Sequence, residues 1–373
     1  MDALTTPSNW QRVRLGDVGK PCMCKRVMKH QTTRYGEIPF YKIGTFGNTA
    51  DAFISKKLFL EYKTKYSFPK KGDILISASG TIGRAVIYDG KPAYFQDSNI
   101  VWIDNDETLV KNDFLFYAYS NVKWNTEHTT ILRLYNDNFR NTLIPLPPLN
   151  EQIAIANILS DLDHYLYTLD ALILKKESVK KALSFELLSQ RKRLKGFNQA
   201  WQKVRLGDIA NYLTSNLSAE QITQQGKIKV YDVNNFIGYT DTTFISDKPY
   251  ISIVKDGSVG RVRILPPKTN ILSTMGALIA NHKTTTEFLF YLLSNFDFKN
   301  FTSGSIIPHI YFKDYKEKTI FLPPLNEQIA IANILSALDS EITSLKNKKR
   351  QFENIKKALN HDLMSAKIRV LKK

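Results

Sequence analysis

A stretch of fifteen residues occurs twice in this sequence without change, and it constrains the fold more than any other feature. Residues 146–160 return 176 positions later as residues 322–336. A repeat this long indicates a duplicated architecture, and two copies predict an internal dimer rather than a solenoid. Shorter matches follow the same order in both halves: 10–18 with 201–209, 79–84 with 256–261, and 114–121 with 288–295. The sequences between them diverge, so we expect a shared framework with different surfaces.

The repeated stretch has the pattern of a helix start. Its two prolines cannot continue a helix and favour an extended approach. Asn150 is expected to cap the helix, and Glu151 to lie near the positive end of its dipole. Ile153 then begins an apolar series at helical spacing. The leads of the two helices, which are also candidate docking sites for partners, comprise Pro147, Pro148, Asn150, Glu151 and Gln152, and Pro323, Pro324, Asn326, Glu327 and Gln328.

Each lead is followed by a long series of apolar residues at steps of three, four and seven. This spacing predicts a coiled-coil seam between the two helices. Two separate amphipathic helices, each packed on its own domain, are the alternative. The predicted seam consists of Leu162, Leu166, Leu169, Leu172, Val179, Leu183 and Leu187 in the first helix, and Leu338, Ile342, Leu345, Phe352, Ile355, Leu359 and Leu363 in the second.

The globular part of each half is predicted to mix helices and strands. Short apolar runs bounded by Gly and Asp favour strands at 74–78, 85–88 and 99–103. Capping residues ahead of aromatic and leucine positions favour helices at 113–120 and 286–294. The chain of 373 residues therefore divides into two globular regions, 1–147 and 197–323, and two helical regions, 148–196 and 324–373.

The chain is strongly basic, with a formal net charge of +17. Such a charge suggests a polyanionic partner, although a generally basic soluble protein is the alternative. The sequence has no apolar run of about 18 residues and no apolar leader, so we expect a cytoplasmic protein without a membrane partner. The two cysteines, Cys22 and Cys24, fall short of the four ligands of a structural zinc site, so reduced thiols and no bound metal are expected.

A Gly-[Ser/Thr]-[Ile/Val]-Gly-Arg motif occurs once in each half. A glycine turn lets backbone amides approach a phosphate, and the arginine can pair with phosphate or guanine. The alternative is a hairpin turn with a solvated arginine. Lysines and arginines near these motifs are further candidates, although any one such lysine is more often an ordinary solvated charge than a contact, so the clusters are better evidence than their members. The candidate DNA contacts are Lys25, Arg26, Arg34, Lys70, Lys71, Thr81, Arg84, Lys255, Ser258, Arg261, Arg263 and Lys268.

Motifs for catalysis are missing from the sequence. It contains neither Gly-x-Ser-x-Gly nor His-Glu-x-x-His, and no glycine-rich cofactor loop follows a strand. An Asn-Pro-Pro-aromatic motif of adenine methylation is also missing. We therefore expect no catalytic residues and no enzymatic activity in this chain alone.

The four duplicated elements together resemble the specificity subunit of type I restriction-modification enzymes. The resemblance rests on the Leu-Pro-Pro-Leu-Asn-Glu-Gln leads, the Trp-x-x-Val-x-Leu-Gly-Asp openings at Trp10 and Trp201, and the two glycine loops. It implies an α+β fold in which two similar mixed α/β target recognition domains are separated by two long antiparallel helices. These would form a coiled coil with pseudo-two-fold symmetry. Each domain would read half of a bipartite, asymmetric sequence in double-stranded DNA.

The resemblance also implies partner subunits. The helices would dock two modification (methyltransferase) subunits, and restriction subunits with translocase and nuclease activity would join them. S-adenosylmethionine, ATP and magnesium would be bound by those partners, with no cofactor in this chain. Two other classes stay open on the residues alone. One is a duplicated scaffold without sequence-specific DNA recognition, and the other is a self-contained methyltransferase or nuclease.

Overall fold

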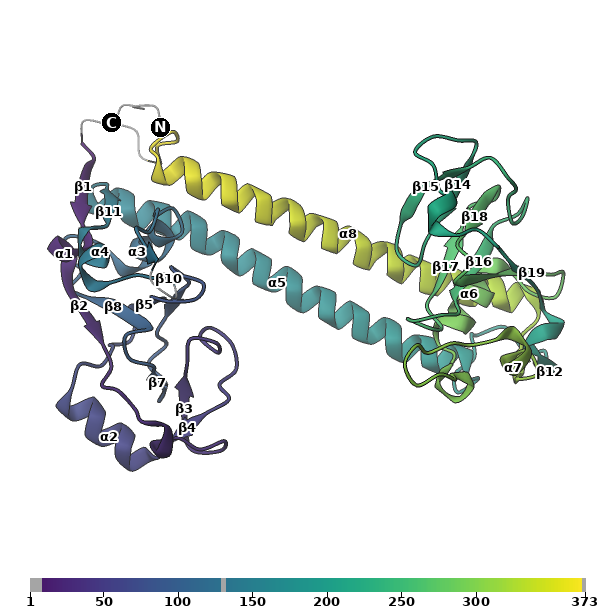
Figure 1. Cartoon of the computed structure of the whole chain (residues 1–373), viewed down its shortest axis with the longest axis horizontal. Helices are drawn as coiled ribbons and strands as arrows, with labels where there is room; N and C mark the ends of the chain where they lie inside the picture. Colours follow the sequence, from purple (N-terminus) through teal and green to yellow (C-terminus); the bar gives the residue numbers. More distant parts are fainter. Residues whose placement is uncertain (1–8, 129–131, 371–373) are drawn as a thin grey trace. The chain divides into compact units, whose positions relative to one another are not determined.

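The computed structural model describes residues 9–128 and 132–370. The chain forms two compact units. Unit one comprises Met1–Leu169 and Lys348–Lys373, and unit two comprises Asp170–Asn347. Helices α5 (Leu149–Leu188) and α8 (Leu325–Met364) have 40 residues each and contribute to both units (Figure 1). Each unit therefore holds one globular domain and part of both long helices.

The globular domain of unit one is built on three small sheets. Strand β1 pairs antiparallel with β11, a four-stranded antiparallel sheet has the order β2-β8-β5-β6, and a mixed sheet has the order β4-β3-β7. The strands are β1 (Gln11–Arg14), β2 (Gly19–Met23), β3 (Ile38–Tyr41), β4 (Phe53–Ile54), β5 (Ile74–Ser77), β6 (Ala85–Ile87), β7 (Tyr94–Phe95), β8 (Ile100–Asn105) and β11 (Leu143–Leu146). A hairpin of β9 (Glu127–His128) and β10 (Leu132–Arg133) and the helices α1 (Leu15–Val18), η1 (Lys29–Gln31), α2 (Lys56–Lys65), α3 (Asn112–Tyr119) and α4 (Asn136–Asn141) complete it.

Unit two repeats this topology sheet by sheet. Its sheets have the orders β12-β20, β13-β19-β16-β17 and β15-β14-β18. The strands are β12 (Gln202–Arg205), β13 (Ala210–Thr214), β14 (Ile228–Tyr231), β15 (Phe236–Thr240), β16 (Tyr250–Val254), β17 (Val262–Leu265), β18 (Thr269–Ile271), β19 (Met275–Ala280) and β20 (Thr319–Leu322). The helices are η2 (Leu206–Asp208), η3 (Ala219–Gln221), α6 (Thr286–Ser294), η4 (Lys299–Phe301) and α7 (Phe312–Tyr315). The predicted α+β fold of two similar domains is confirmed.

Local sequence accounts for the elements that were predicted. Strand β5 is buried along its whole length, as an uninterrupted apolar run requires. Helix α6 has the predicted bounds because the Thr285 side chain accepts a hydrogen bond from the Phe288 amide and caps its first turn. Helix α3 begins at Asn112, one residue before the predicted start. Each glycine motif forms the turn between two adjacent antiparallel strands, β5-β6 and β16-β17.

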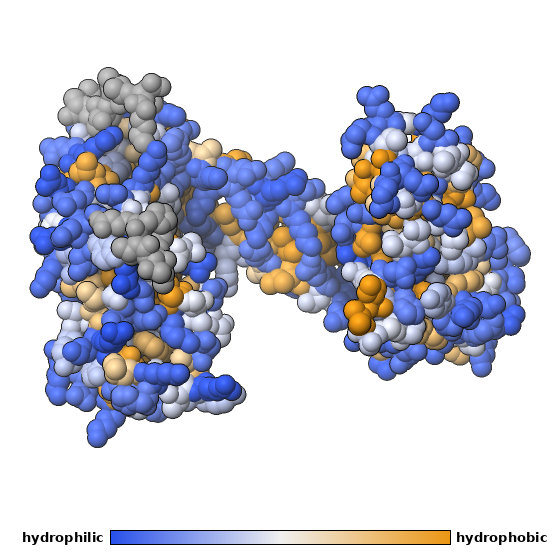
Figure 2. Space-filling view, in the orientation of Figure 1, coloured by the Kyte–Doolittle hydropathy of each residue, from blue (hydrophilic) through white to orange (hydrophobic). Residues whose placement is uncertain are grey.

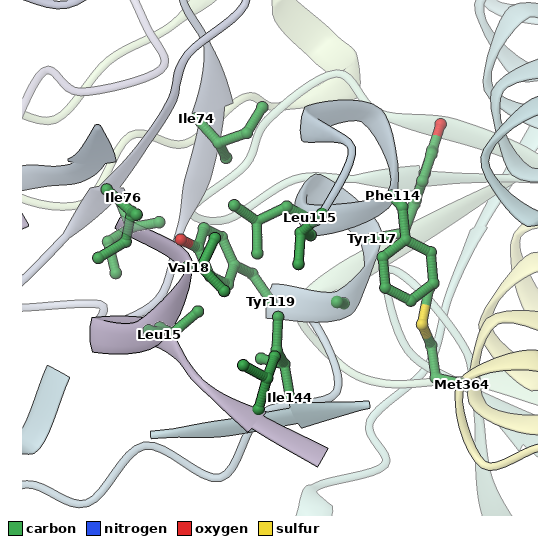
Figure 3. Packing of buried hydrophobic residues seen from close by; sticks show 14 of the residues in the cluster. Leu15, Val18, Ile74, Ile76, Phe114, Leu115, Tyr117, Tyr119, Ile144 and Met364 are labelled. Atoms are coloured by element: carbon green, nitrogen blue, oxygen red, sulfur yellow. The ribbon is translucent and has the colours of Figure 1, made fainter. Parts of the chain in front are cut away.

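The core of each globular domain is completed by the helix that follows the other domain. In unit one, Met364 at the end of α8 packs beside Phe114 and Tyr117 of α3 (Figure 3). In unit two, Leu187 near the end of α5 joins a core that includes Phe288 of α6. Burial of these apolar side chains removes them from water and stabilises the attachment. Each domain therefore depends on residues from the opposite half of the sequence.

The two long helices run antiparallel in each unit. In unit one, the rings of Tyr165 and Phe352 lie 4.7 Å apart. In unit two, the Lys176 amine lies 2.7 Å from a Glu341 carboxylate oxygen. The predicted coiled-coil pattern is correct in its spacing, with strict steps of four and three through Leu162, Leu166, Leu169 and Ile173.

Three predicted seam positions were wrong. Leu172, Val179 and Ile355 are exposed, while Ile173 is buried. After Leu169 the heptad positions are Ile173, Lys176 and Lys180. The seam therefore keeps its spacing although two of these positions are lysines. These partly buried lysines are paired with carboxylates of α8, which compensates their removal from water.

The surface of the visible face in both units is mostly hydrophilic, with smaller apolar patches between polar residues (Figure 2). Throughout the described ranges, no helix has the length and apolar character needed to cross a membrane.

Candidate DNA and subunit interfaces

The two glycine loops have the same backbone geometry. The amide of Gly83 donates to the Ser77 carbonyl oxygen and that of Gly260 to the Val254 carbonyl oxygen, both at 2.9 Å. Both glycines have positive φ, +83° and +78°. A Cβ at Gly83 would lie 2.1 Å from Trp124 Nε1, and one at Gly260 would lie 2.6 Å from the Phe298 ring. The loops are therefore rigid turns in which glycine allows an aromatic ring to pack against the backbone.

The arginines of the two loops make different contacts. Arg84 is exposed, and its guanidinium donates to the Phe46 carbonyl oxygen in the loop after β3 at 2.9 Å. In unit two a different arginine, Arg263, contacts the equivalent loop after β14. It donates to the Asn234 carbonyl oxygen at 2.9 Å, and its guanidinium lies over the Tyr231 ring. Arg261, at the motif position, is exposed. Arg84 and Arg263 thus brace equivalent loops, and the two arginines at the motif position, Arg84 and Arg261, are both exposed.

The other predicted DNA contacts lie on the surface, and several already have partners. Lys70 pairs with Asp104 at 2.9 Å, which raises the pKa of Lys70, and Arg26 lies 3.8 Å from Asp97. The Lys25 amine lies over the Tyr66 ring. A phosphate would have to compete with these partners or share the cation. Exposed candidates are Arg34, Lys71, Thr81, Ser258 and Lys268, while Lys255 is half-buried. Each contact stays a prediction.

The structure places a second segment beside each glycine loop, which sequence reasoning missed. In unit one, Arg133 and Ser79 both donate to the Asn99 side-chain oxygen, at 3.0 and 2.8 Å. In unit two, Asp256 and His309 form a β-bridge. Ser79 and Arg133 form the equivalent β-bridge in unit one. The residues of these two bridges are 54 and 53 positions apart in the sequence, and no local pattern signals that they meet.

The glutamate of each helix lead is buried and bound inside the chain. Glu151 is 2% exposed, accepts from Trp10 Nε1 at 3.0 Å and accepts twice from Arg369, at 2.7 and 2.9 Å. Glu327 is fully buried and accepts from Trp201 Nε1 and from Arg193. A buried carboxylate needs such partners to offset its loss of water.

The glutamine of each lead is also buried and bound inside the chain. Gln152 accepts from the Lys111 amide and donates to the Leu109 and Pro147 carbonyl oxygens. Gln328 accepts from the Thr285 amide and donates to the Lys283 and Pro323 carbonyl oxygens. Glu151, Gln152, Glu327 and Gln328 therefore join each domain to its own helix. The docking role of the leads stays a prediction, and these four side chains are already bound inside the chain.

The first turn of each long helix begins two residues earlier than a cap at the lead asparagine predicts. Helix α5 starts at Leu149, so Asn150 is its second residue and not the cap, although its side chain accepts from the Glu151 amide at 3.0 Å. Asn326 does the same for the Glu327 amide in α8. Pro147 and Pro323 are buried, and Pro148 and Pro324 are half-buried.

Each lead exposes an apolar pair. Leu149 and Ile153, four residues apart on α5, are 40% and 46% exposed, and Leu325 and Ile329 on α8 are 46% and 49% exposed. We name these the lead pairs. Ile153 begins the apolar series that the sequence showed at helical spacing, but it is exposed and Ile155 is buried instead. The lead pairs are identical in the two copies, although none of their four residues belongs to a domain core that would require the identity.

A second duplicated cluster fixes each domain to both long helices. Asp163 of α5 accepts from the Tyr117 hydroxyl at 2.8 Å and pairs with Lys356 of α8. Asp339 of α8 accepts from the Tyr291 hydroxyl at 2.9 Å and pairs with Lys180 of α5. Burial and the adjacent aspartate raise the pKa of both tyrosines, so they remain hydrogen-bond donors at neutral pH.

The two cysteines lie in unit one. Cys24 is buried, and burial raises the pKa of its thiol to about 12, so it stays protonated at neutral pH. Within residues 9–128 and 132–370, no three His, Cys, Asp or Glu side chains gather as a potential metal site.

Comparison with known proteins identifies the family. Residues 7–176 and 198–354 match the family described as the type I restriction modification DNA specificity domain. The chain belongs to this family. A specificity subunit of a type I restriction enzyme from Methanocaldococcus jannaschii, MjaX, is 30% identical over 80% of this chain and 79% of its own length. The MjaVIII subunit of the same organism is 27% identical over 99% of this chain and 95% of its own length.

One further relative is more similar over a shorter region. A type I restriction enzyme specificity subunit of Haemophilus influenzae is 64% identical over 148 residues, which is 39% of this chain and 38% of that protein. The chain thus aligns with about two fifths of that relative's length.

Solved structures support the fold. The specificity subunit of a type I restriction-modification system from M. genitalium has a TM-score of 0.64 at 20% identity and covers 97% of both chains. A chain from a study of complex assembly and conformational transition in a type I system has a TM-score of 0.56 at 15% identity, covering 96% of this chain and 98% of its own.

Proposed function

We propose that the chain is the DNA-recognition subunit of a type I restriction-modification complex and that each globular domain reads one half of a bipartite, asymmetric target. The observation that carries this proposal is one strand topology bearing two different surfaces. Helix α2 follows β4 in unit one, for example, whereas residues 241–249 after β15 in unit two contain no helix. Two unlike surfaces on one framework suit two unlike half-sites.

The net charge of +17 supports double-stranded DNA as the ligand. The scaffold alternative predicts that charge attracts any DNA equally. The test measures binding of the assembled complex to its methylated target sequence and to random DNA across a salt series. Sequence-specific recognition predicts target affinity about 10³-fold or more above random DNA at physiological salt. Equal affinity for both at every salt concentration would favour the scaffold.

The lead pairs are the proposed docking sites for two modification subunits. The burial pattern of residues 151–160 matches that of 327–336, so two copies of one partner could bind in the same way. Exposed apolar residues at i and i+4 on a helix suit a hydrophobic protein contact. Binding of the same partner by both lead pairs would explain why the two copies have identical residues at these exposed positions. Packing of the domain cores does not require that identity.

Paired substitutions test this docking. Leu149→Ser with Ile153→Ser should reduce the modification subunits bound from two to one, as should Leu325→Ser with Ile329→Ser, and combining all four should leave none. Native mass spectrometry of the purified complex measures the stoichiometry. Leu174→Ser, at an exposed position on α5 away from both leads, is the control and should keep two partners. Two partners bound to the fourfold variant would rule out the lead pairs.

Methylation and cleavage are assigned to the partners. S-adenosylmethionine, ATP and magnesium would bind to the modification and restriction subunits, and this chain would be non-catalytic. The purified chain should neither bind S-adenosylmethionine nor transfer methyl groups to DNA. Methyl transfer by the chain free of other subunits would instead favour a self-contained methyltransferase.

The long helices are proposed to fix the gap between the half-sites. Each is an uninterrupted helix of 40 residues, which corresponds to about 60 Å at about 1.5 Å per residue. The heptad seam locks the register of the two helices and so resists sliding.

A further inference from the structure

Unit two exposes an apolar hairpin tip that none of the proposed interactions uses. Residues 303–309 form this hairpin between η4 and α7, and we name it the apolar finger. Ile306 and Ile307 at its tip are 91% and 63% exposed. The exposed fraction of Ile306 exceeds that of any other large apolar side chain in the described ranges. Two adjacent isoleucines held in water are costly unless a partner covers them.

The finger is a fixed structure and not a loose loop. The Ser303 amide donates to the His309 carbonyl oxygen at 2.9 Å, and the His309 amide donates back at 2.8 Å. Gly304 has φ of +90°, and a Cβ there would lie 2.3 Å from the Ile307 carbonyl oxygen. Glycine is therefore required to turn the chain tightly, and the two isoleucines are presented without a large entropic cost of ordering.

The base of the finger is attached to the second glycine loop. The Gly257 amide donates to the Pro308 carbonyl oxygen at 2.8 Å, and the Ile310 amide donates to the Lys255 carbonyl oxygen at 2.9 Å. Ser258 and Arg261 of that loop are exposed candidates for DNA contact. The hairpin that presents the isoleucines is thus hydrogen-bonded to the turn that carries these polar candidates.

Cations and rings flank the finger. The His309 and Tyr311 rings lie 5.1 Å apart, and the Lys313 amine lies over the Tyr311 ring at 5.4 Å. Lys255 and Arg261 lie on the glycine loop, where Asp256 is the one acidic residue. An apolar tip bordered by cations suits a ligand with a charged outer backbone and an apolar stacked interior, which describes double-stranded DNA.

We propose that the apolar finger inserts Ile306 and Ile307 into the base stack of the half-site that unit two reads. Apolar wedges of this kind partly unstack a base step, while neighbouring cations hold the phosphates. This inference rests on the proposed DNA-recognition function and adds an element that deforms the target. A protein partner is the competing occupant of the same tip.

Fluorescence of 2-aminopurine tests the insertion, because the fluorescence of this base rises when it unstacks. The chain assembled with its modification subunits is mixed with duplexes that carry the methylated target sequence, with 2-aminopurine placed at successive positions of one half-site. The wild type should raise the signal at one step. Ile306→Ser with Ile307→Ser should abolish the rise and weaken binding about tenfold or more. The salt dependence of binding should not change, because no phosphate contact is lost.

Two further variants sharpen the result. Gly304→Ala keeps both isoleucines but disturbs the turn, so it should reduce the signal in the same way. Leu213→Ser removes an exposed apolar residue from β13, at the edge of the sheet opposite β17, and should behave as wild type.

The possible outcomes distinguish failure of the insertion from failure of the proposed DNA recognition. Wild-type fluorescence and affinity in the double isoleucine variant would overturn the insertion while leaving DNA recognition intact. Loss of a bound subunit in native mass spectrometry, with unchanged DNA affinity in the complexes that form, would assign the finger to a protein contact. Failure of the wild-type complex to prefer target over random DNA would instead overturn the proposed function itself.

Discussion

Arg369 donates two hydrogen bonds to the buried carboxylate of Glu151, which lies 218 residues earlier in the chain. Unit two contains the same arrangement, in which Arg193 donates to the carboxylate of Glu327. Arg193 lies 176 residues before Arg369, and Glu327 lies 176 residues after Glu151. The segment that follows one long helix therefore binds the start of the other. These two reciprocal ion pairs attach the end of each long helix to the domain that the other long helix follows.

Replacing Arg369 with alanine should destabilise unit one selectively. Glu151 would keep its bond from Trp10 but lose its charged partner while buried, a loss that is unfavourable. Hydrogen exchange should quicken most in β1 and β11. Arg193→Ala is the matched control and should quicken exchange most in β12 and β20. Equal effects of either variant on both units would contradict the pairing described.

Removing the exchanged core side chains should have larger effects. Met364→Ala is expected to lower the free energy of unfolding of unit one by about 2–5 kcal/mol, because it leaves a cavity beside Phe114. Leu187→Ala should do the same in unit two. Urea denaturation followed by hydrogen exchange assigns the loss to a unit. If Met364→Ala weakened unit two instead, the end of α8 would not belong to the core of unit one.

The glycine loops offer a graded test of backbone strain. Gly257 has φ of +83° with open space around its Cβ position, so Gly257→Ala should cost about 1–2 kcal/mol from conformation alone. Gly260→Ala should cost about 1–3 kcal/mol more, because its Cβ would collide with the Phe298 ring. Thermal unfolding of both variants measures the difference. Equal stability would show that the ring moves aside freely.

Much of the framework could be predicted from the sequence because its elements are determined by residues close to one another in the chain. The duplicated leads, the apolar run of β5 and the capped helix α6 each depend on neighbouring residues. The partners of Glu151 could not be predicted, since Trp10 and Arg369 lie at opposite ends of the chain. The seam was misassigned at Leu172 because the predicted series took a second step of three after Leu169, whereas the alternation of four and three leads to Ile173. The finger was missed because an Ile-Ile pair normally indicates burial.

The spacing role of the helices can be measured by lengthening them. Inserting one heptad after Leu169, with a matching heptad in α8, should widen the gap between half-sites by about three base pairs. Seven residues add about 10 Å to a helix, and DNA rises about 3.4 Å per base pair. An insertion in α5 alone should break the seam and destabilise the protein. An unchanged gap in an active complex with both insertions would assign the spacing to the partner subunits.

The most direct test of the account is the sequence methylated in cells when one recognition surface is exchanged. Residues 19–145 are replaced with the corresponding region of another family member, and methylated adenines are mapped by single-molecule sequencing. The account predicts a bipartite sequence in which one half changes, while the other half and the gap stay as in the wild type. A change in both halves, or in neither, with the complex assembled and active, would contradict independent reading by the two domains.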